Sequence, residues 1–349
     1  MMDISKAPRW AELDDAQRAL HKAFHDVRVR HPKLDAVLEQ IHPLLMLHGE
    51  SNIVYIVGAT GIGKSTLSRY ALKQFYDQYA DLTASDISAI PVVNVEAYCD
   101  GDTRHGFRGL YEDLRTALQE PAPDRKAFIE EADGHMSLRS TQRMTIRQLR
   151  KLVEKGLKSR RTKVVVIDEA YHLLKFAMDS AVMDTLKSLA NTTGTKFVLV
   201  GSFDLFSLVD SHAQVARRSA FVHFERYRPE RSDDCTAFRK IVLSLQEKWP
   251  LADVPNFVAI WDELMTVSLG CVGLLKSFLL DALAMQLLND GTWDCAFLQR
   301  AAMANKLRAI IEKEIVSGEQ EIEEALYGHG AWNSKRLAEL RRRMEVGHA

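Results

Sequence analysis

Apolar positions along the chain follow two different periods, which predict helices in some segments and buried strands in others. In the first fifty residues the apolar side chains recur every three or four positions, over residues 16–24 and again over 34–45, as on one face of a helix. His31-Pro32 separates the two stretches, because the residue before a proline disfavours helical backbone. The sequence therefore predicts a helical N-terminal segment over residues 1–50.

Five short apolar runs rich in β-branched residues follow the other pattern. Such continuous runs are typical of strands that are buried on both faces of a parallel sheet. Helical spacing fills the stretches between them, and this alternation predicts an α/β fold with a five-stranded parallel sheet over residues 51–229. The runs are Ile53–Val57, Pro91–Val95, Val164–Ile167, Phe197–Val200 and Phe221–Phe224.

Strand patterns stop after about Pro229, and helical spacing covers residues 235–248, 257–268, 274–288 and 294–317. This change predicts a separate helical domain over residues 230–330, followed by a short basic tail over 331–349.

Composition limits the class of protein. The chain has 349 residues, of which 46% are hydrophobic and 27% charged, which is enough apolar material for one or two cores and argues against disorder. The net charge of −1 does not exclude a nucleic-acid partner, because a balanced total can hide a basic patch. Four widely spaced cysteines form no CxxC pair, and no apolar run approaches the roughly 20 residues of a membrane span. We therefore expect a cytoplasmic protein without a zinc site or a membrane segment.

A phosphate-binding loop follows the first predicted strand. The stretch reads GATGIGKST and matches the pattern GxxxxGK[ST], with a strand before it and a helix after it. Its glycines allow a tight loop whose backbone N–H groups point at a phosphate, and the dipole of the following helix adds positive charge. We expect Lys64 to bind the β- and γ-phosphates and Ser65 to bind Mg²⁺. The residues assigned to nucleotide binding here are Gly58, Ala59, Thr60, Gly61, Ile62, Gly63, Lys64, Ser65 and Thr66.

Two carboxylates end the third predicted strand. Asp168 is expected to lie at the carboxyl edge of the sheet beside the loop, where it can hold Mg²⁺ through water. Glu169 follows it and is positioned to polarise an attacking water as a general base. Ser202, after the fourth strand, is a candidate to face the γ-phosphate, or else it is an ordinary strand-to-loop serine.

Three basic residues are candidates to control hydrolysis. Arg217 and Arg218 come just before the fifth strand, where an arginine can reach a nucleotide bound by a neighbouring subunit. Lys276 lies near the start of a helix in the C-terminal domain and can fold back onto the γ-phosphate. The alternatives are a solvated arginine pair and an ordinary surface lysine.

The order of these motifs resembles that of an AAA+ ATPase. GATGIGKST, VVVIDEA, the strand ending in LVGS, the ARR before the fifth strand and the GCVGLLK helix occur in family order over residues 50–290. Within this superfamily the chain is similar to the TnsC/TniB group of transposition regulators, which is related to the Mu B protein and the origin-recognition ATPases. The narrower resemblance is carried by the helical preface with His31-Pro32, the compact core, the IDEAYHL form of the Asp-Glu strand and a lid of one helical bundle.

The resemblance implies a P-loop AAA+ core with an N-terminal helical preface and a C-terminal helical lid. It also implies ATP and Mg²⁺ as cofactors, and homo-oligomeric rings or filaments on duplex DNA that connect a target-selector protein to the transposase. Hydrolysis of ATP would then dissolve the assembly. Lysine at Lys276, where an arginine is usual, departs from the family pattern, because a point charge replaces a bidentate fork.

Two stretches are candidates for sequence-independent DNA binding. Residues 139–163 carry ten basic residues and one acid, and Arg139, Arg143, Arg147 and Arg150 share a face if the stretch is one helix. The alternative is a solvated helix face that the acidic run 127–133 neutralises. The second candidate is the loop after the second strand, with Thr103, Arg104 and Arg108, because an inserted element near this point touches DNA in the resembled family.

Two other functions stay open at this point. One is an AAA+ ATPase of a secretion or plasmid-maintenance system. The other is a scaffold that binds ATP and hardly hydrolyses it, against which the intact Glu169 argues.

Overall fold

The computed structural model describes residues 13–46, 52–97, 106–120, 127–132, 135–140, 144–175, 179–206 and 219–327. The chain divides into two compact units. Residues 28–226 form what we call the α/β unit, and residues up to Val27 join those from Tyr227 onward in the helical unit.

A five-stranded parallel sheet organises the α/β unit, as the sequence predicts. Its strands stand in the order β2-β5-β6-β1-β7, so that β6 lies between the strand before the phosphate loop and the strand that ends in the two carboxylates. Every residue of β1 and β5 is buried, which explains their uninterrupted apolar sequences. The bounds are β1 Ile53–Gly58, β2 Val92–Glu96, β5 Val164–Asp168, β6 Lys196–Gly201 and β7 Ser219–Phe224.

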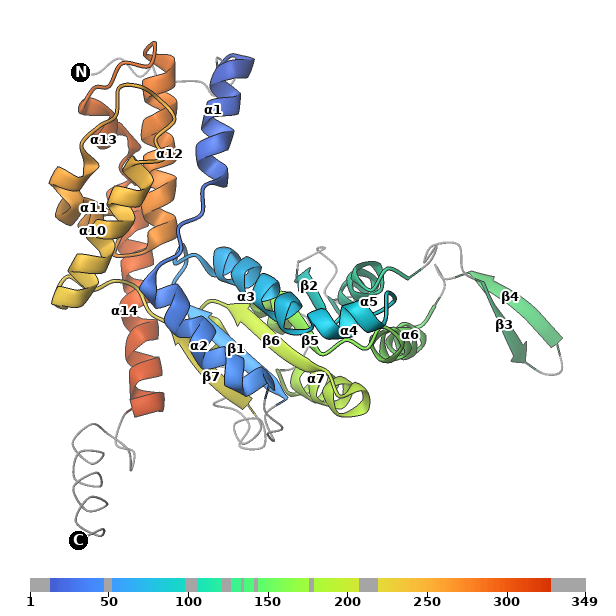
Figure 1. The fold of residues 1–349 in the computed structure, drawn as a ribbon. Coiled ribbons are helices and arrows are strands. Elements are labelled where there is room, and N and C mark those ends of the chain that lie inside the picture. Colours follow the sequence, from blue (N-terminus) through green and yellow to red (C-terminus); the bar gives the residue numbers. More distant parts are fainter. Residues whose placement is uncertain are drawn as a thin grey trace, which may run out of the picture. The chain divides into compact units, whose positions relative to one another are not determined.

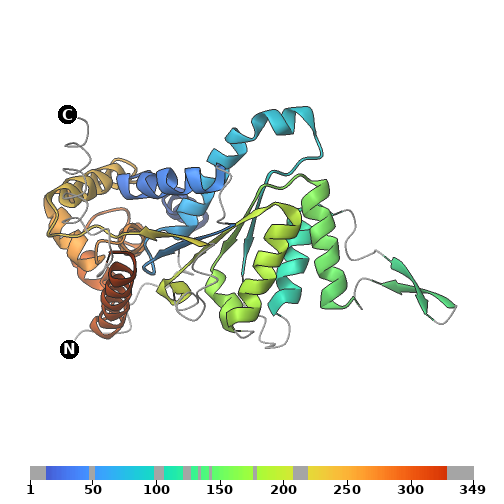
Figure 2. The same cartoon turned by 90° about the horizontal axis from the view of Figure 1, so that it is seen from below.

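Helices cover both faces of this sheet. Figure 2 shows α2 and α3 on one face and α5, α6 and α7 on the other, as in a three-layer α/β fold. The bounds are α2 Pro32–Met46, α3 Lys64–Gln78, α4 Ala80–Ser85, α5 Gly106–Ala117, α6 Ile146–Ser159, α7 Asp179–Thr193, and the 3-10 turns η5 Ala170–Lys175 and η6 Phe203–Phe206.

A β-hairpin occupies part of the basic stretch 139–163 and the acidic run before it, where one continuous helix was one prediction for the basic stretch. Strands β3 (Ala127–Ala132) and β4 (His135–Ser140) pair antiparallel, with Phe128 opposite Arg139, and Figure 1 shows them outside the layers of the sheet. The helix α6 starts only after Thr145, whose side chain forms a capping box with Gln148. The expectation that Arg139 and Arg147 share a helix face is therefore wrong.

The helical unit is built around α12, whose apolar side chains are buried on several sides. A cluster of edge-to-face aromatic rings completes its core, with Trp249 contacting Phe24, Phe257 and Trp293. The first helix belongs to this unit, whereas α2 belongs to the α/β unit and packs on β7. The two N-terminal helices, predicted as one segment over residues 1–50, are therefore divided between the units. The bounds are α1 Asp15–Asp26, α10 Ser232–Gln246, η7 Phe257–Ile260, α11 Trp261–Val267, α12 Val272–Leu288, α13 Ala296–Ala301 and α14 Asn305–Tyr327.

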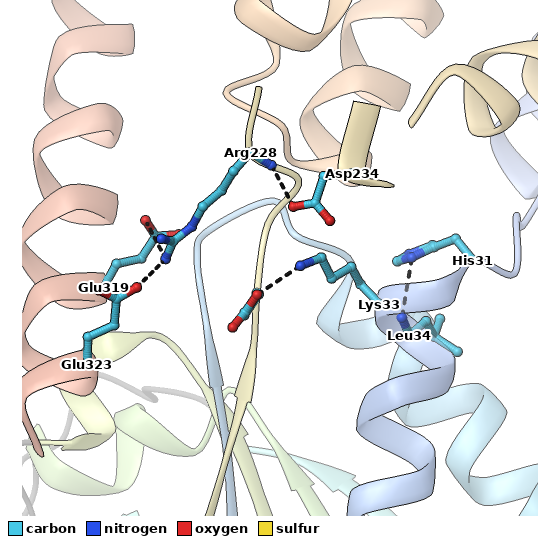
Figure 3. Close-up of polar contacts among 8 residues, drawn as sticks. His31, Lys33, Leu34, Arg228, Asp234, Glu319 and Glu323 are labelled. Atoms are coloured by element: carbon cyan, nitrogen blue, oxygen red, sulfur yellow. Dashed lines mark hydrogen bonds and ion pairs between the residues drawn. The ribbon is translucent and has the colours of Figure 1, made fainter. Parts of the chain in front are cut away.

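The chain enters the helical unit after β7 along a tightly held segment. Gly270 has φ +72° and lies so close to Tyr227 that a β-carbon there would be 1.8 Å from its carbonyl oxygen, so only glycine fits. The next residue, Arg228, contacts Glu319 and Glu323 of α14 through its guanidinium, and its backbone N–H donates to Asp234 (Figure 3). These contacts tie the segment after β7 to the first turn of α10 and to the later part of α14.

No single helix in the described ranges is long and apolar enough to cross a membrane. One bent pair, residues 257–267 with 272–288 at 120°, passes the test of length and composition only when the two helices are combined.

His31 is a buried titratable group in the α/β unit. Its ring Nδ1 accepts a hydrogen bond from the backbone N–H of Leu34 at 3.3 Å (Figure 3). The imidazole ring also stacks against the ring of Phe224. Burial lowers its pKa to about 4, against the smaller raising effect of the Asp35 carboxylate. In the unfolded chain this histidine binds a proton near pH 6.5, whereas in the folded protein it does so only near pH 4. The free energy of unfolding therefore falls as the pH drops between these two values.

We expect His31→Asn, which keeps an acceptor at the helix start, to reduce the acid sensitivity of the fold. The free energy of unfolding of the native protein should fall by about 3 kcal/mol between pH 7 and pH 4 on account of this group alone. Urea unfolding across this range measures the difference, with the exposed His25→Asn as the matched control. Equal pH dependence in His31→Asn and the native protein would contradict this assignment.

Candidate nucleotide-binding site

The loop between β1 and α3 has the backbone conformation that its glycines permit. Gly61 and Gly63 have φ of +73° and +112°, in the left-handed region that other residues rarely adopt. Gly58 ends β1, and a β-carbon there would lie 2.8 Å from the carbonyl oxygen of Phe224 on β7. The loop can therefore turn tightly against the sheet and open directly into α3.

Lys64 is buried in this loop, with 8% of its surface exposed. Its Nζ donates to the carbonyl oxygens of Gly58 and Ala59 at 3.1 and 3.0 Å. The backbone N–H groups of Thr66 and Leu67 bond to Gly63, whereas the earlier N–H groups of a helix have no partner within the helix. The loop thus gathers positive charge at one point, which is the requirement for binding phosphate.

Asp168 ends β5 and is also 8% exposed. One of its oxygens accepts from the Ser68 hydroxyl of α3 at 3.4 Å, and the other accepts from the backbone N–H of Glu169 at 3.0 Å. Burial raises the pKa of this carboxyl, and the Glu169 and Glu96 carboxylates add to the shift. The Glu169 N–H and the Lys64 ammonium oppose it.

Glu169 and Ser202 follow the ends of neighbouring strands. Glu169 is half-buried and has φ +50°, an unusual conformation for a residue other than glycine and one that is found at functional sites. Ser202 comes directly after β6, and its hydroxyl donates to the carboxylate of Asp204 at 3.3 Å. Both residues therefore lie at the carboxyl edge of the sheet, where the order of the strands places them next to the phosphate loop.

The residues at this edge fit a nucleotide phosphate with Mg²⁺. A buried carboxylate with a raised pKa gains from a cation, and the buried Lys64 ammonium, which donates to two loop carbonyl oxygens, gains from an anion. The exposed Ser65 in the first turn of α3 adds a hydroxyl, a ligand type that Mg²⁺ accepts. Lys64 would bind the phosphates, while Ser65 and Asp168 would hold the metal.

Two polar residues at the site were not predicted. Ser68 lies one turn after Lys64 on α3, so the spacing of four residues places it on the same side of the helix. Glu96 ends β2 and pairs in register with Asp168, in the same way that Asp168 itself ends a buried strand. Glu96 is a polar residue directly after an apolar run, and this pattern can be used to predict from sequence that it lies at the carboxyl edge of the sheet.

The other predicted site residues lie elsewhere or outside the described residues. Lys276 of α12 donates from its Nζ to the carbonyl oxygens of His25 and Val27, at the end of α1, and its role at a phosphate stays a prediction. Arg108 is half-buried and contacts the Met144 carbonyl and Glu112, while Arg147 is exposed on α6. The residues outside the described ranges are Thr103, Arg104, Arg143, Arg217 and Arg218.

Comparisons with known proteins agree with this geometry. Residues 47–209 match a family whose description is "AAA domain". Residues 47–209 form an AAA-type P-loop ATPase domain. No curated protein matches the chain in sequence.

Solved structures that are similar to this chain match it over more residues than the AAA domain alone. The Aeropyrum pernix ORC1 protein in complex with DNA is 16% identical, with a TM-score of 0.57 over 88% of this chain and 72% of that chain. The Aeropyrum pernix ORC2 protein, in ADPNP-ADP complexes, is 15% identical, with a TM-score of 0.54 over 80% of this chain and 70% of that chain. Identities this low show a shared fold, which is the α/β AAA+ fold with additional helices before and after it.

We expect Lys64→Ala to weaken nucleotide binding by at least about tenfold, because a charge-assisted hydrogen bond contributes about 1.5–3 kcal/mol. Titration of a fluorescent ATP analogue measures this, with Lys73→Ala, an exposed lysine of the same helix, as the control. Unchanged affinity in Lys64→Ala would remove this lysine from the site.

We expect Asp168→Asn to stop Mg²⁺-dependent hydrolysis and to raise the thermal midpoint of the nucleotide-free AAA domain at pH 7. A carboxyl whose pKa is raised in the folded state costs stability once it is ionised, and this cost grows as the pH rises through the raised pKa. Asparagine removes the charge and therefore the cost. Calorimetric scans from pH 4 to pH 8 would contradict the argument if the variant melted lower than the native protein at neutral pH.

Proposed function

We propose that this ATPase is a DNA-binding, oligomeric regulator of transposition, in which hydrolysis of ATP controls disassembly. The ATP-dependent part of the proposal is carried by the meeting of Lys64, Asp168 and Glu169 at one edge of the sheet. The fold similarity to an ORC1 protein whose structure is a complex with DNA supports the choice of ligand. The IDEAYHL strand and the His31-Pro32 preface support the link to TnsC/TniB-type regulators.

Each residue at the sheet edge has a separate part in hydrolysis. Bound Mg²⁺ would neutralise charge that develops on the phosphates. Lys64 and the loop N–H groups hold the phosphates in place, while Ser65 and Asp168 hold the metal. Glu169 accepts the proton of the attacking water, and Ser202 orients that water.

The proposal includes oligomers because an arginine finger, an arginine that stabilises the charge on the phosphates during hydrolysis, would come from a neighbouring copy of the protein. Arg217 or Arg218 precedes β7, next to the strand of the phosphate loop, and would act on the nucleotide of an adjacent subunit. Such an assembly, on duplex DNA and without sequence preference, would connect a target-selector protein to the transposase.

Glu169→Gln should bind ATP normally, stall hydrolysis and form longer-lived assemblies on DNA, because the amide holds the water but cannot take its proton. Electron microscopy of the protein with duplex DNA and ATP, before and after a chase with competitor DNA, measures the lifetime of the assemblies. Glu247→Gln, at an exposed residue just after α10, is the matched control.

Wild-type turnover in Glu169→Gln would remove this residue from the role of general base. Assemblies that dissolve equally fast in both variants would contradict the proposed link between hydrolysis and disassembly. A native protein that binds ATP but does not turn it over would favour the scaffold alternative.

A further inference from the structure

The helix α6 carries a row of four exposed cations. Arg147, Lys151, Lys155 and Lys158 have the spacing i, i+4, i+8 and i+11, so they follow one another along a single face. The opposite face buries Leu149, Val153 and Leu157 against the α/β unit. We call these four residues the α6 cation row, and at 1.5 Å per residue they span about 16 Å of helix.

The α6 cation row is costly for the helix that carries it. Arg147 lies in the first turn, where the helix dipole favours acids, and α6 has no acid there. Neighbours along the row are like charges three or four residues apart, which repel each other. Among the described residues no ion pair joins any of the four to a carboxylate. Unfavourable local interactions of this kind, with no compensating contact, are expected where a surface has a function.

Side-chain hydrogen bonds tie α6 and the residues just before it to the neighbouring helices α7 and α5. Arg150 bonds to Glu154 at 3.0 Å and to the Ser188 hydroxyl of α7 at 2.6 Å, so the only acid of the helix is already engaged on another side. The guanidinium of Arg108 binds the carbonyl of Met144, just before the capping box at Thr145. The helix that carries the four cations is thus attached to its neighbours by contacts that do not use the row.

We propose that the α6 cation row binds the phosphate backbone of duplex DNA, an inference that rests on the proposed function. Lysine is depleted in protein–protein interfaces, whose centres are apolar and poor in charge, and three of the four residues of the row are lysines. Phosphate binding needs a line of cations and no apolar centre. The chain as a whole has a net charge of −1, so the row is a local feature.

The test is the combined variant Lys151→Gln, Lys155→Gln and Lys158→Gln, which keeps helix propensity and removes three charges. Binding of labelled duplex DNA is titrated in a saturating ATP analogue at several salt concentrations. The slope of log affinity against log salt should become shallower by about 2.7, at about 0.9 for each lost phosphate contact. The matched control is Arg239→Gln, Lys240→Gln and Lys248→Gln, which removes three exposed charges from the helical unit, from α10 and the segment just after it.

The outcomes separate this inference from the proposed function. If the native protein does not bind duplex DNA, the DNA-binding part of the proposed function fails. If it binds and the α6 variant shows the native slope, or if the control loses as much, the α6 cation row is not the DNA surface. Loss of labelled polyglutamate binding with an unchanged DNA slope would assign the row to an acidic protein instead. The thermal midpoint of the α6 variant should equal or exceed the native value, because repulsion is removed, which shows that the variant is folded.

Discussion

The burial of one ammonium and one carboxylate at the same edge of a sheet constrains the rest of the α/β unit. Lys64 and Asp168 are each 8% exposed, and neither charge is stable in an apolar interior without partners. The parallel arrangement brings the ends of β1 and β5 to that edge, and β6 between them adds Ser202. The parallel pairing of β1 with β7 then brings Phe224 so close to Gly58 that a β-carbon there would lie 2.8 Å from its carbonyl oxygen.

The site is therefore built from groups that do not favour folding. Burial raises the pKa of the Asp168 carboxyl and so disfavours its charged form, and Glu169 takes a strained backbone conformation. Fully buried strands and amphipathic helices on both faces of the sheet provide the offsetting stability. This division, with an apolar scaffold and a strained polar edge, is the usual physical basis of a ligand site.

The sequence was most informative where one local pattern determines one local structure. The β-branched runs predicted all five parallel strands, and GATGIGKST predicted the loop between β1 and α3, with Lys64 as the first residue of α3. Ser68 and Glu96 were missed because their proximity to Asp168 depends on packing and register. The hairpin was missed because charge spacing was interpreted as helical across a stretch whose first part is strand. The division of the N-terminal helices between two units depends on long-range contacts, which no local pattern contains.

The central claim is that the loop lysine and the strand carboxylate are the two sides of an ATP and Mg²⁺ site. A crystal structure with a non-hydrolysable ATP analogue and Mg²⁺ tests it most directly. The account predicts that Lys64 Nζ leaves the carbonyls of Gly58 and Ala59 for phosphate oxygens, with the metal beside Ser65 and Asp168. Nucleotide bound elsewhere, with Lys64 still bonded to its own loop, would contradict it.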